Sequence, residues 1–505
     1  MEQSNTIDRP ARPLTATGTA LVWLAFISGL AALALLMLPG FVFSEDTIGI
    51  VVTGAAFVVL LCVGLGSAIV QHARTRVTVY RLALLIWWFL LVCEVIFDRL
   101  NDEYHVYQGT FATQAYGEAV MWVLSFITLL LISLQQPSYF GQLFSKSFRW
   151  VSLFTLACLA SIAYAPGKMY SAAWGFKLLL VVLLLQLCAD AMRDFDDVVI
   201  FLKTTLWAFL VLTIVPVLVA LSNPATAFVE QRLNATPDLL SPLAGSLLLM
   251  AMTLYALEKR RIFALAGGTG AVIMILAFGK TGIISGVLGA VIFLVLQKKV
   301  MRSVGLLVGL AVLGILILSV TPLGDYLRSY QGGSTFTGRT ALWEAALAAT
   351  RQKLIFGHGY LATYFSWRNS SGLLPGYLHL HNGFVEIAYN NGLVGLGLML
   401  AIHVAMVKNI FSSLRMITIL RSREPGNQRV AQAYFLTIGS LALYINVFVE
   451  GMFGSSFGGR LMSPFMLFLG LFMMVASVQR LTADLLRHSV STRDQIPAAW
   501  PASAH

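Results

Sequence analysis

The sequence predicts an all-α, polytopic integral membrane protein with about fourteen transmembrane helices and one long ordered external loop. Of its 505 residues, 58% are hydrophobic and only 11% are charged, whereas soluble domains carry about 25% charged residues. The mean hydropathy is +0.80. Apolar runs of about 17–25 residues recur along the chain, and each can cross a hydrocarbon core about 30 Å thick as a helix. The runs show no alternation with a period of two residues, which argues against a β-barrel.

The predicted helices follow one another with short connections. The first apolar run is too long for a signal-peptide core and has no convincing cleavage site, so we expect a retained helix. A tail, residues 1–17, precedes helices 1–11 within 18–321, and a long loop, 322–382, leads to helices 12–14 within 383–480 and a tail at 481–505. The predicted spans are 18–43, 47–71, 77–97, 115–135, 150–165, 171–189, 199–221, 240–257, 261–278, 281–297, 303–321, 383–407, 432–452 and 463–480.

The distribution of charge predicts the orientation in the membrane. The formal net charge is +11, and a cytoplasmic amino terminus places about 21 of the Lys and Arg residues in cytoplasmic segments and about 10 outside. Cytoplasmic connections then include EKRR (258–261), QKKVMR (297–302) and a basic loop at 408–431. Both termini are expected in the cytoplasm. The cysteines, which all fall in predicted spans, indicate no disulfide or metal cage: Cys62, Cys93, Cys158 and Cys188.

The long external loop is the segment where chemistry is expected. Long loops in compact proteins usually carry function or are disordered, and this loop contains a helical pattern, TALWEAALAATRQKL (340–354). Three elements follow in order: TGRTALW (337–343), FGHGY (356–360) and HNGFVEIAYNNGLVGLG (381–397). We expect an ordered cap over the membrane domain.

These three elements together resemble the C-terminal signature of the O-antigen ligase and polymerase family of bacterial envelope proteins. His381 and Asn382 are followed by nine residues, Gly392, two residues and Gly395, which matches the family spacing in full. The resemblance covers about 120 residues well. It extends more weakly to RLNATPDLLSPLAG (232–245) and to AFGKTG (277–282), where Lys280 replaces the arginine of many relatives.

The resemblance implies a glycosyl-chain transferase of the bacterial inner membrane. The donor would be an oligosaccharide on a polyprenyl diphosphate, such as undecaprenyl diphosphate, and the acceptor another glycan at the periplasmic face. We favour a polymerase of exopolysaccharide or O-antigen repeat units, with an O-antigen ligase acting on lipid A core as the alternative. A flippase and a chain-length regulator are candidate partners. From another class, a secondary transporter stays open, although no convincing inverted repeat is visible.

The chemistry of such a transfer selects candidate residues. A diphosphate leaving group needs cations beside the bilayer, and the planar guanidinium of arginine matches phosphate oxygens. Arg339 is the first candidate, Lys280 the second and Arg232 the third. The attacking hydroxyl needs a proton acceptor, for which His381 is the best-placed base. Arg339 and His381 are therefore the predicted catalytic residues.

Other polar residues near these motifs are candidates for binding substrate. Asn382 and Glu386 are four positions apart and share a helix face, and His381 is expected to cap the start of that helix. Glu386 could orient the acceptor or tune His381. Carboxylates within spans are costly and functional by default, which singles out Glu450, together with Arg460 beyond the same helix end, and also Glu94 and Glu118.

Several tempting features receive structural interpretations. His358 and His379 are expected to be structural, and Lys177 and Lys203 to extend their amines toward the membrane surface. The GKT at 279–281 lacks the preceding glycine and strand of a phosphate-binding loop. Asp194 and Asp196, on either side of Phe195, are expected on the cytoplasmic side, and no α/β domain is predicted in which they could bind a metal. No metal or other cofactor is therefore expected. No surface suits a nucleic acid.

Overall fold

The computed structural model describes the central and C-terminal parts of the chain. The described residues are 76–98, scattered positions between 122 and 129, 148–221, 228–229, 232–233, 237–299, scattered positions between 301 and 312, 339–365, and 380–494 without 455, 456 and 458. The predicted spans at 18–43 and 47–71, and most of those at 115–135 and 303–321, lie outside this set.

Almost all regular structure in the described part is helical. A two-residue pair of antiparallel strands, β1 and β2, adds a small turn with Val229 opposite Arg232. In chain order the elements are α3 (Arg76–Asp98), α6 (Arg149–Ser161), η2 (Ile162–Tyr164), α7 (Lys168–Ala191), α8 (Phe195–Leu221), β1 (Phe228–Val229), β2 (Arg232–Leu233), α9 (Pro237–Glu258), α10 (Arg261–Ala277), α11 (Lys280–Leu296), α14 (Arg339–Gln352), η3 (Ala362–Tyr364), α16 (Gly383–Arg423), α17 (Gln428–Phe453) and α18 (Ser463–Asp494).

Six of the described helices are long and apolar enough to cross a membrane: α7, α8, α9, α16, α17 and α18. Shorter apolar helices lie at 79–92, 149–164, 261–277 and 280–296. All of these coincide with predicted spans, so the all-helical, polytopic membrane architecture is confirmed. The total of about fourteen spans stays a prediction, because the remaining runs fall wholly or mostly outside the described residues.

Helix α16 corrects one predicted connection. The basic segment 408–431 was expected as a loop, but α16 continues to Arg423 and only residues 424–427 separate it from α17. Its 41 residues would span about 61 Å as one straight helix, which exceeds the hydrocarbon thickness. A break at Gly392, with φ 63° and ψ −159°, divides it into a short first part and a long membrane-crossing part.

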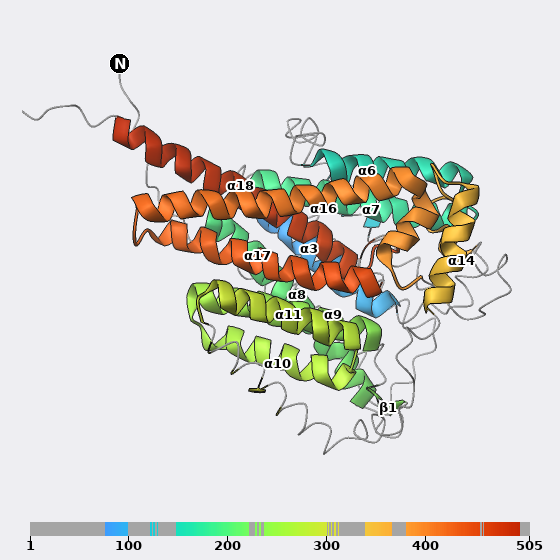
Figure 1. Ribbon diagram of the computed structural model, residues 1–505, viewed down its shortest axis with the longest axis horizontal. Coiled ribbons are helices and arrows are strands. Elements are labelled where there is room, and N and C mark those ends of the chain that lie inside the picture. The colour runs from blue at the N-terminus through green and yellow to red at the C-terminus, as the bar shows by residue number, and fades with distance from the viewer. Residues whose placement is uncertain are drawn as a thin grey trace, which may run out of the picture.

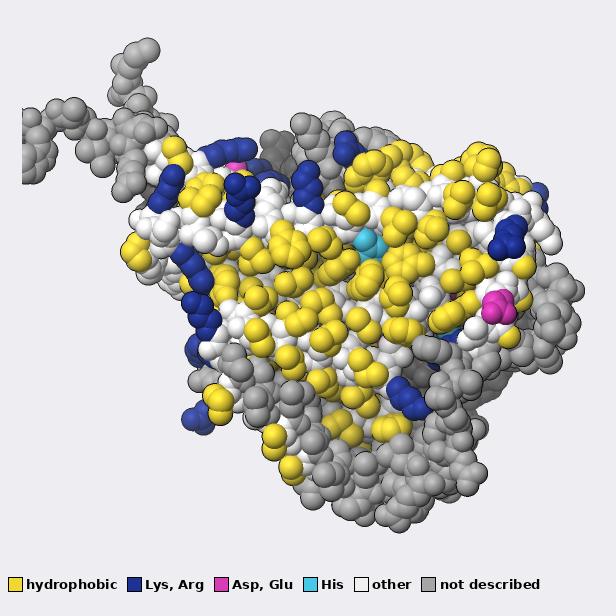
Figure 2. All heavy atoms as spheres, viewed as in Figure 1, with side chains coloured by type: hydrophobic (Ala, Val, Ile, Leu, Met, Phe, Trp, Pro, Cys, Tyr) yellow, Lys and Arg dark blue, Asp and Glu magenta, His cyan; other side chains and the backbone are white. Residues whose placement is uncertain are grey.

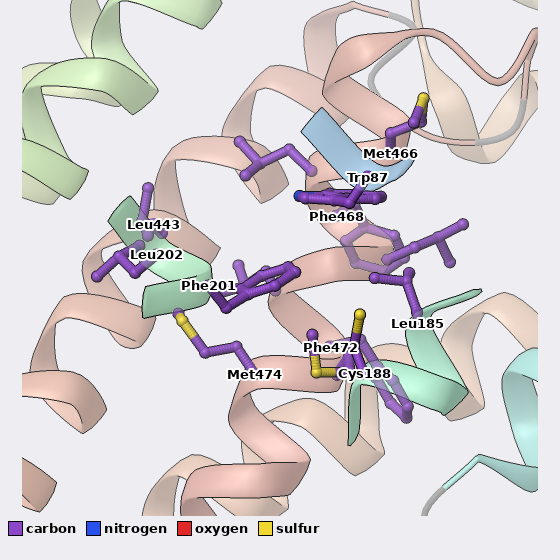
Figure 3. Close-up of a cluster of buried hydrophobic side chains, with 14 of the residues drawn as sticks. Trp87, Leu185, Cys188, Phe201, Leu202, Leu443, Met466, Phe468, Phe472 and Met474 are labelled. Carbon is purple, nitrogen blue, oxygen red and sulfur yellow. The ribbon is translucent and has the colours of Figure 1, made fainter. Parts of the chain in front are cut away.

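The core is formed by large apolar side chains from helices that are distant in sequence. Trp87 of α3 stacks on Phe201 of α8 with ring centroids 5.6 Å apart, and its indole nitrogen donates to the Thr205 hydroxyl over 3.0 Å. Phe468 and Phe472 of α18 are fully buried beside them (Figure 3). Association of helices in lipid depends on such close packing and internal hydrogen bonds, because lipid tails are as apolar as the side chains.

The helix ends gather at two opposite ends of the bundle. One end holds α14, the start of α16 and the end of α17, and is called the site end below (Figure 1). At the opposite end, Gln432 donates to Asp196 over 2.9 Å, Arg480 donates to the Met192 carbonyl over 2.7 Å, and Lys203 forms an ion pair with Glu258. The connections predicted as cytoplasmic therefore share one end.

The lateral surface is apolar, as a membrane protein requires. On α16 the exposed side chains Leu400, Val404 and Phe411 form one stripe, which follows from their spacing along the helix. Figure 2 shows hydrophobic side chains covering much of one face, with Lys and Arg gathered along the edge where α16 ends and α17 begins. This agrees with an apolar band in lipid and a basic edge outside it.

The charge distribution leads to a topology prediction. Alkaline phosphatase fused after Ser370 should be active, because we expect the 322–382 segment to face the periplasm. The same enzyme fused after Gly426, in the turn between α16 and α17, should be inactive. The activity of both fusions is compared at equal fusion-protein abundance, and the reverse pattern would contradict both the orientation and the site's location.

Candidate functional site

Helix α14 carries the first signature element, and its side chains connect two other parts of the site end. Arg339 is the first residue of α14, and Trp343 lies four positions later on the same face. The Arg339 guanidinium donates to the carbonyl oxygen of Phe453, the last residue of α17, over 2.9 Å. The Trp343 indole donates to the Leu380 carbonyl over 2.7 Å. The residue that follows Leu380 is His381, so α14 joins the two predicted catalytic residues.

The third signature element begins with an unusual backbone conformation. His381 has φ 49°, a left-handed conformation that non-glycine residues adopt rarely and often at functional sites. The expectation that His381 caps the helix is wrong: Asn382 is the N-cap, and its side-chain oxygen accepts from the backbone N–H groups of Phe384 and Val385 over 3.0 and 3.1 Å. His381 thus lies just outside the helix start.

Residues 353–359 and the break in α16 form a backbone clamp. The N–H groups of His358 and Gly359 donate to the carbonyls of Tyr389 and Asn390 over 2.9 and 2.7 Å, and the N–H of Leu393 donates to the Leu354 carbonyl over 2.9 Å. A Cβ on Gly392 would overlap the Ile355 carbonyl oxygen.

The clamp also explains one glycine in each of the second and third elements. Gly357 has φ 70°, and a Cβ there would lie 2.5 Å from the Asn390 carbonyl oxygen. Glycines spaced as Gly-x-x-Gly near the start of a transmembrane helix predict close packing against another helix, but Gly392 packs instead on the FGHGY turn. The second and third signature elements are distant in sequence but share one set of hydrogen bonds.

His358 and Tyr360 hold this turn in place. A ring nitrogen of His358 lies 3.1 Å from the Ala349 carbonyl, and the ring stacks on Tyr389 with centroids 4.4 Å apart. Burial lowers the pKa of His358, which fits a neutral, structural imidazole. The Tyr360 carbonyl accepts from Ser171 at 2.6 Å. The structural interpretation of His358 agrees with these contacts.

Two carboxylates flank the segment between α17 and α18. Glu386 is fully buried, and a Cβ on Gly459 would lie 2.8 Å from its Oε1. Glu450 is also buried, near Gly454. Their neighbour Phe457 is fully buried against Gly383, where a Cβ would overlap the Phe457 carbonyl. This contact explains the glycine that follows His381 and Asn382.

Lys280 reaches the same end through a second group of helices. It is the exposed first residue of α11. Lower in that helix Ser285 donates to Asn446 of α17 over 2.9 Å. Along the axis of α11, Lys280 lies about 7.5 Å before Ser285, and along the axis of α17, Phe453 lies about 10 Å after Asn446. Because α11 and α17 are antiparallel, both distances run toward the same end. Lys280 and the carbonyl that binds Arg339 therefore lie at a similar level.

Arg232 and Arg460 complete the placement of the predicted cations. Arg232 lies in β2, next to the start of α9 at the site end. The Arg460 guanidinium carbon lies 5.3 Å from the Tyr364 ring centroid and 5.8 Å from that of Trp174. All predicted site residues thus belong to segments at the site end.

One predicted side-chain arrangement is wrong. Lys177 does not extend toward the membrane surface: it is fully buried, with its amine 5.0 Å from the Trp122 ring and 4.6 Å from the Trp174 ring. Phe457 and Trp174 were not singled out from the sequence. Trp174 lies three positions before Lys177 on α7, and this spacing was the signal from which their contact could have been predicted.

Metal independence leads to a further prediction. We expect the cations at this end to be Arg and Lys side chains, so EDTA should leave transfer activity in purified membranes unchanged. Activity is measured before and after chelation and again after washing. A strict and reversible requirement for added Mg²⁺ or Mn²⁺ would contradict the proposed use of these side chains.

Comparison with known proteins agrees with the motifs. No curated protein matches the chain. Residues 245–400 match the model of a family described as O-antigen ligase. The matched region includes Lys280, Arg339 and His381, which the structure places at one end of the helices, whereas Arg232, Glu450 and Arg460 lie outside it. Residues 245–400 are thus similar to the O-antigen ligase family, and this region supports the resemblance that the motifs indicate.

Proposed function

We propose that the protein transfers an oligosaccharide from a polyprenyl-diphosphate donor to an acceptor glycan at the periplasmic face of the inner membrane. The observation that carries this proposal is the location of three helix starts, all within the family match, at the site end. Lys280 begins α11, Arg339 begins α14, and His381 immediately precedes the cap of α16. Helix N-termini favour anions, so two cations and these helix ends suit a diphosphate.

The proposed reaction uses His381 as general base. Its imidazole accepts the proton of the acceptor hydroxyl, whose oxygen then forms a bond to the anomeric carbon of the donor. The bond from that carbon to the diphosphate oxygen breaks, and the electron pair leaves with the polyprenyl diphosphate. Arg339 and Lys280 stabilise the new negative charge. No redox step or cofactor is required for this exchange.

Arg339 serves two purposes in this proposal. Its hydrogen bond to the Phe453 carbonyl fixes one side of the planar guanidinium, whose remaining N–H groups can bind phosphate oxygens. The left-handed backbone of His381 is held by the Asn382 cap on one side and by the Trp343 contact to Leu380 on the other. Such preorganisation lowers the cost of orienting groups during the reaction.

Within this chemistry we propose a polymerase of exopolysaccharide or O-antigen repeat units. The second candidate is an O-antigen ligase that uses lipid A core as acceptor; the description of the matched family names a ligase, but the match does not distinguish the two activities. The two differ in the acceptor, not in the bond that breaks. The family match lends no support to the secondary transporter.

A deletion strain separates the two candidates. Loss of a polymerase should abolish long polysaccharide and leave single-repeat material, because one repeat unit can still be made and transferred. The lengths of the surface glycan and of the lipid-linked glycan are compared by gel electrophoresis. Long chains that accumulate on the polyprenyl carrier would instead identify the ligase, and normal glycan in both pools would refute both candidates.

A further inference from the structure

We propose that Trp174 of α7 positions the Arg460 guanidinium for the diphosphate of the donor and that Lys177 holds the Trp174 ring. The inference rests on the proposed function for the identity of the anion. Neither α7 nor Arg460 lies within residues 245–400. Trp174 and Lys177 would act as positioning residues, and Arg460 would contact the substrate.

Lys177 is the first part of this arrangement. It lies in the interior of α7, is 0% exposed, and has the rings of Trp122 and Trp174 at 5.0 and 4.6 Å. A cation inside a membrane protein is costly and usually functional. Aromatic rings offset part of this cost through their negative faces. The interaction in turn restricts the orientation of the Trp174 indole.

Trp174 joins this buried cation to Arg460. The guanidinium carbon of Arg460 lies 5.8 Å from the Trp174 ring centroid, within the range of a cation–π interaction. Trp174 is itself buried and packs near Tyr170, with ring centroids 6.2 Å apart. The indole therefore has little freedom to turn, and its contact restricts Arg460.

Tyr364 holds Arg460 from a second element. The Arg460 guanidinium carbon lies 5.3 Å from the centroid of the Tyr364 ring, and Tyr364 lies in η3, which closely follows the FGHGY turn. Burial raises the pKa of Tyr364, although Arg460 acts in the opposite direction, so the phenol stays neutral. Side chains of α7 and η3 thus orient Arg460, which itself lies between α17 and α18.

The segment that carries Arg460 is anchored beside the start of α16. Phe457 is fully buried with ring centroids 4.9 Å from His403 and 4.8 Å from Phe384. Two residues later Gly459 lies against Glu386, one turn into α16. These contacts leave Arg460 partly exposed next to the start of α16, where the proposed diphosphate site lies.

A double-mutant cycle tests the proposed order of action. Binding of undecaprenyl diphosphate, the carrier without glycan, is measured on the purified full-length protein. Arg460→Ala should weaken binding by about ten- to one-hundredfold, and Trp174→Ala by about three- to thirtyfold. The double variant should bind no more weakly than Arg460→Ala, because Trp174 acts through that residue.

Two further variants and a control on another cation–π pair extend the test. Trp174→Phe keeps an aromatic ring and should retain part of the binding, whereas Lys177→Met should weaken binding only when Arg460 is present. The control is Trp150→Ala, which removes another cation–π pair, formed with Arg149 at 4.6 Å on α6. It should leave binding unchanged.

The outcomes distinguish this inference from the proposed function. Independent, multiplicative effects of Trp174→Ala and Arg460→Ala would overturn the positioning role, as would an unchanged affinity in either single variant. If Trp174→Ala does not fold, the same comparison is made with Trp174→Phe. Absence of binding by the wild-type protein would overturn the donor class itself, and the inference with it.

Discussion

Arg339→Ala and His381→Ala should each abolish the long polysaccharide in a complemented deletion strain. Loss of general-base assistance typically lowers a rate by about 10²–10⁴, and loss of a preorganised contact to a developing anion by about 10²–10³. Arg339→Lys keeps the charge but loses the planar fork, so it should also be impaired. Polysaccharide length and amount are measured by gel electrophoresis.

The matched control lies on the same helix. Arg351, in the last turn of α14, is exposed, and Arg351→Ala should support wild-type polysaccharide. Protein abundance in the membrane must be equal in all variants, because Arg339→Ala also removes the hydrogen bond to Phe453. If both alanine variants at Arg339 and His381 still produce full-length polysaccharide at normal abundance, the catalytic assignment is wrong.

Gly392→Ala should have the largest effect on stability. Gly392 has φ 63° and ψ −159°, a region almost restricted to glycine, and a side chain there costs about 1–3 kcal/mol from the backbone alone. The added Cβ would also overlap the Ile355 carbonyl, which disrupts the clamp. We expect a large decrease in the Tm of the detergent-purified protein and loss of polysaccharide.

Gly397→Ala provides the comparison within α16. A Cβ at Gly397 meets no atom within 4 Å, and alanine favours a helix over glycine by about 0.5–1 kcal/mol. Its Tm should be unchanged or slightly raised. Equal Tm values for the two alanine variants would show that the clamp does not depend on the backbone conformation of Gly392.

The local sequence predicted α14 well and α16 only in part. Both Arg339 and Trp343 fall on a short helix where an amphipathic pattern was visible. In α16, a run of apolar residues predicts helix on both sides of Gly392 but contains no sign of its left-handed φ. That angle is fixed by hydrogen bonds to residues 354–359, which are about 35 residues earlier in the chain.

The predicted site residues illustrate a second limit. The order and spacing of the motifs selected Lys280, Arg339 and His381, and all three lie within residues 245–400; their roles in the site stay a prediction. The cap at Asn382 was assigned to the wrong neighbour, because both residues are polar and precede the same helix. Only backbone geometry distinguishes an N-cap from the residue before it.

By itself, the sequence determined that this protein is an assembly of apolar helices and that its signature residues lie beside one of them. Those properties follow from composition and periodicity, which act over a few turns of chain. The tertiary structure alone decided that Lys177 is buried between Trp122 and Trp174. It also decided that the FGHGY turn clamps α16 at Gly392. Such contacts join segments far apart in sequence, where no local pattern can specify which side chains or backbone groups will meet.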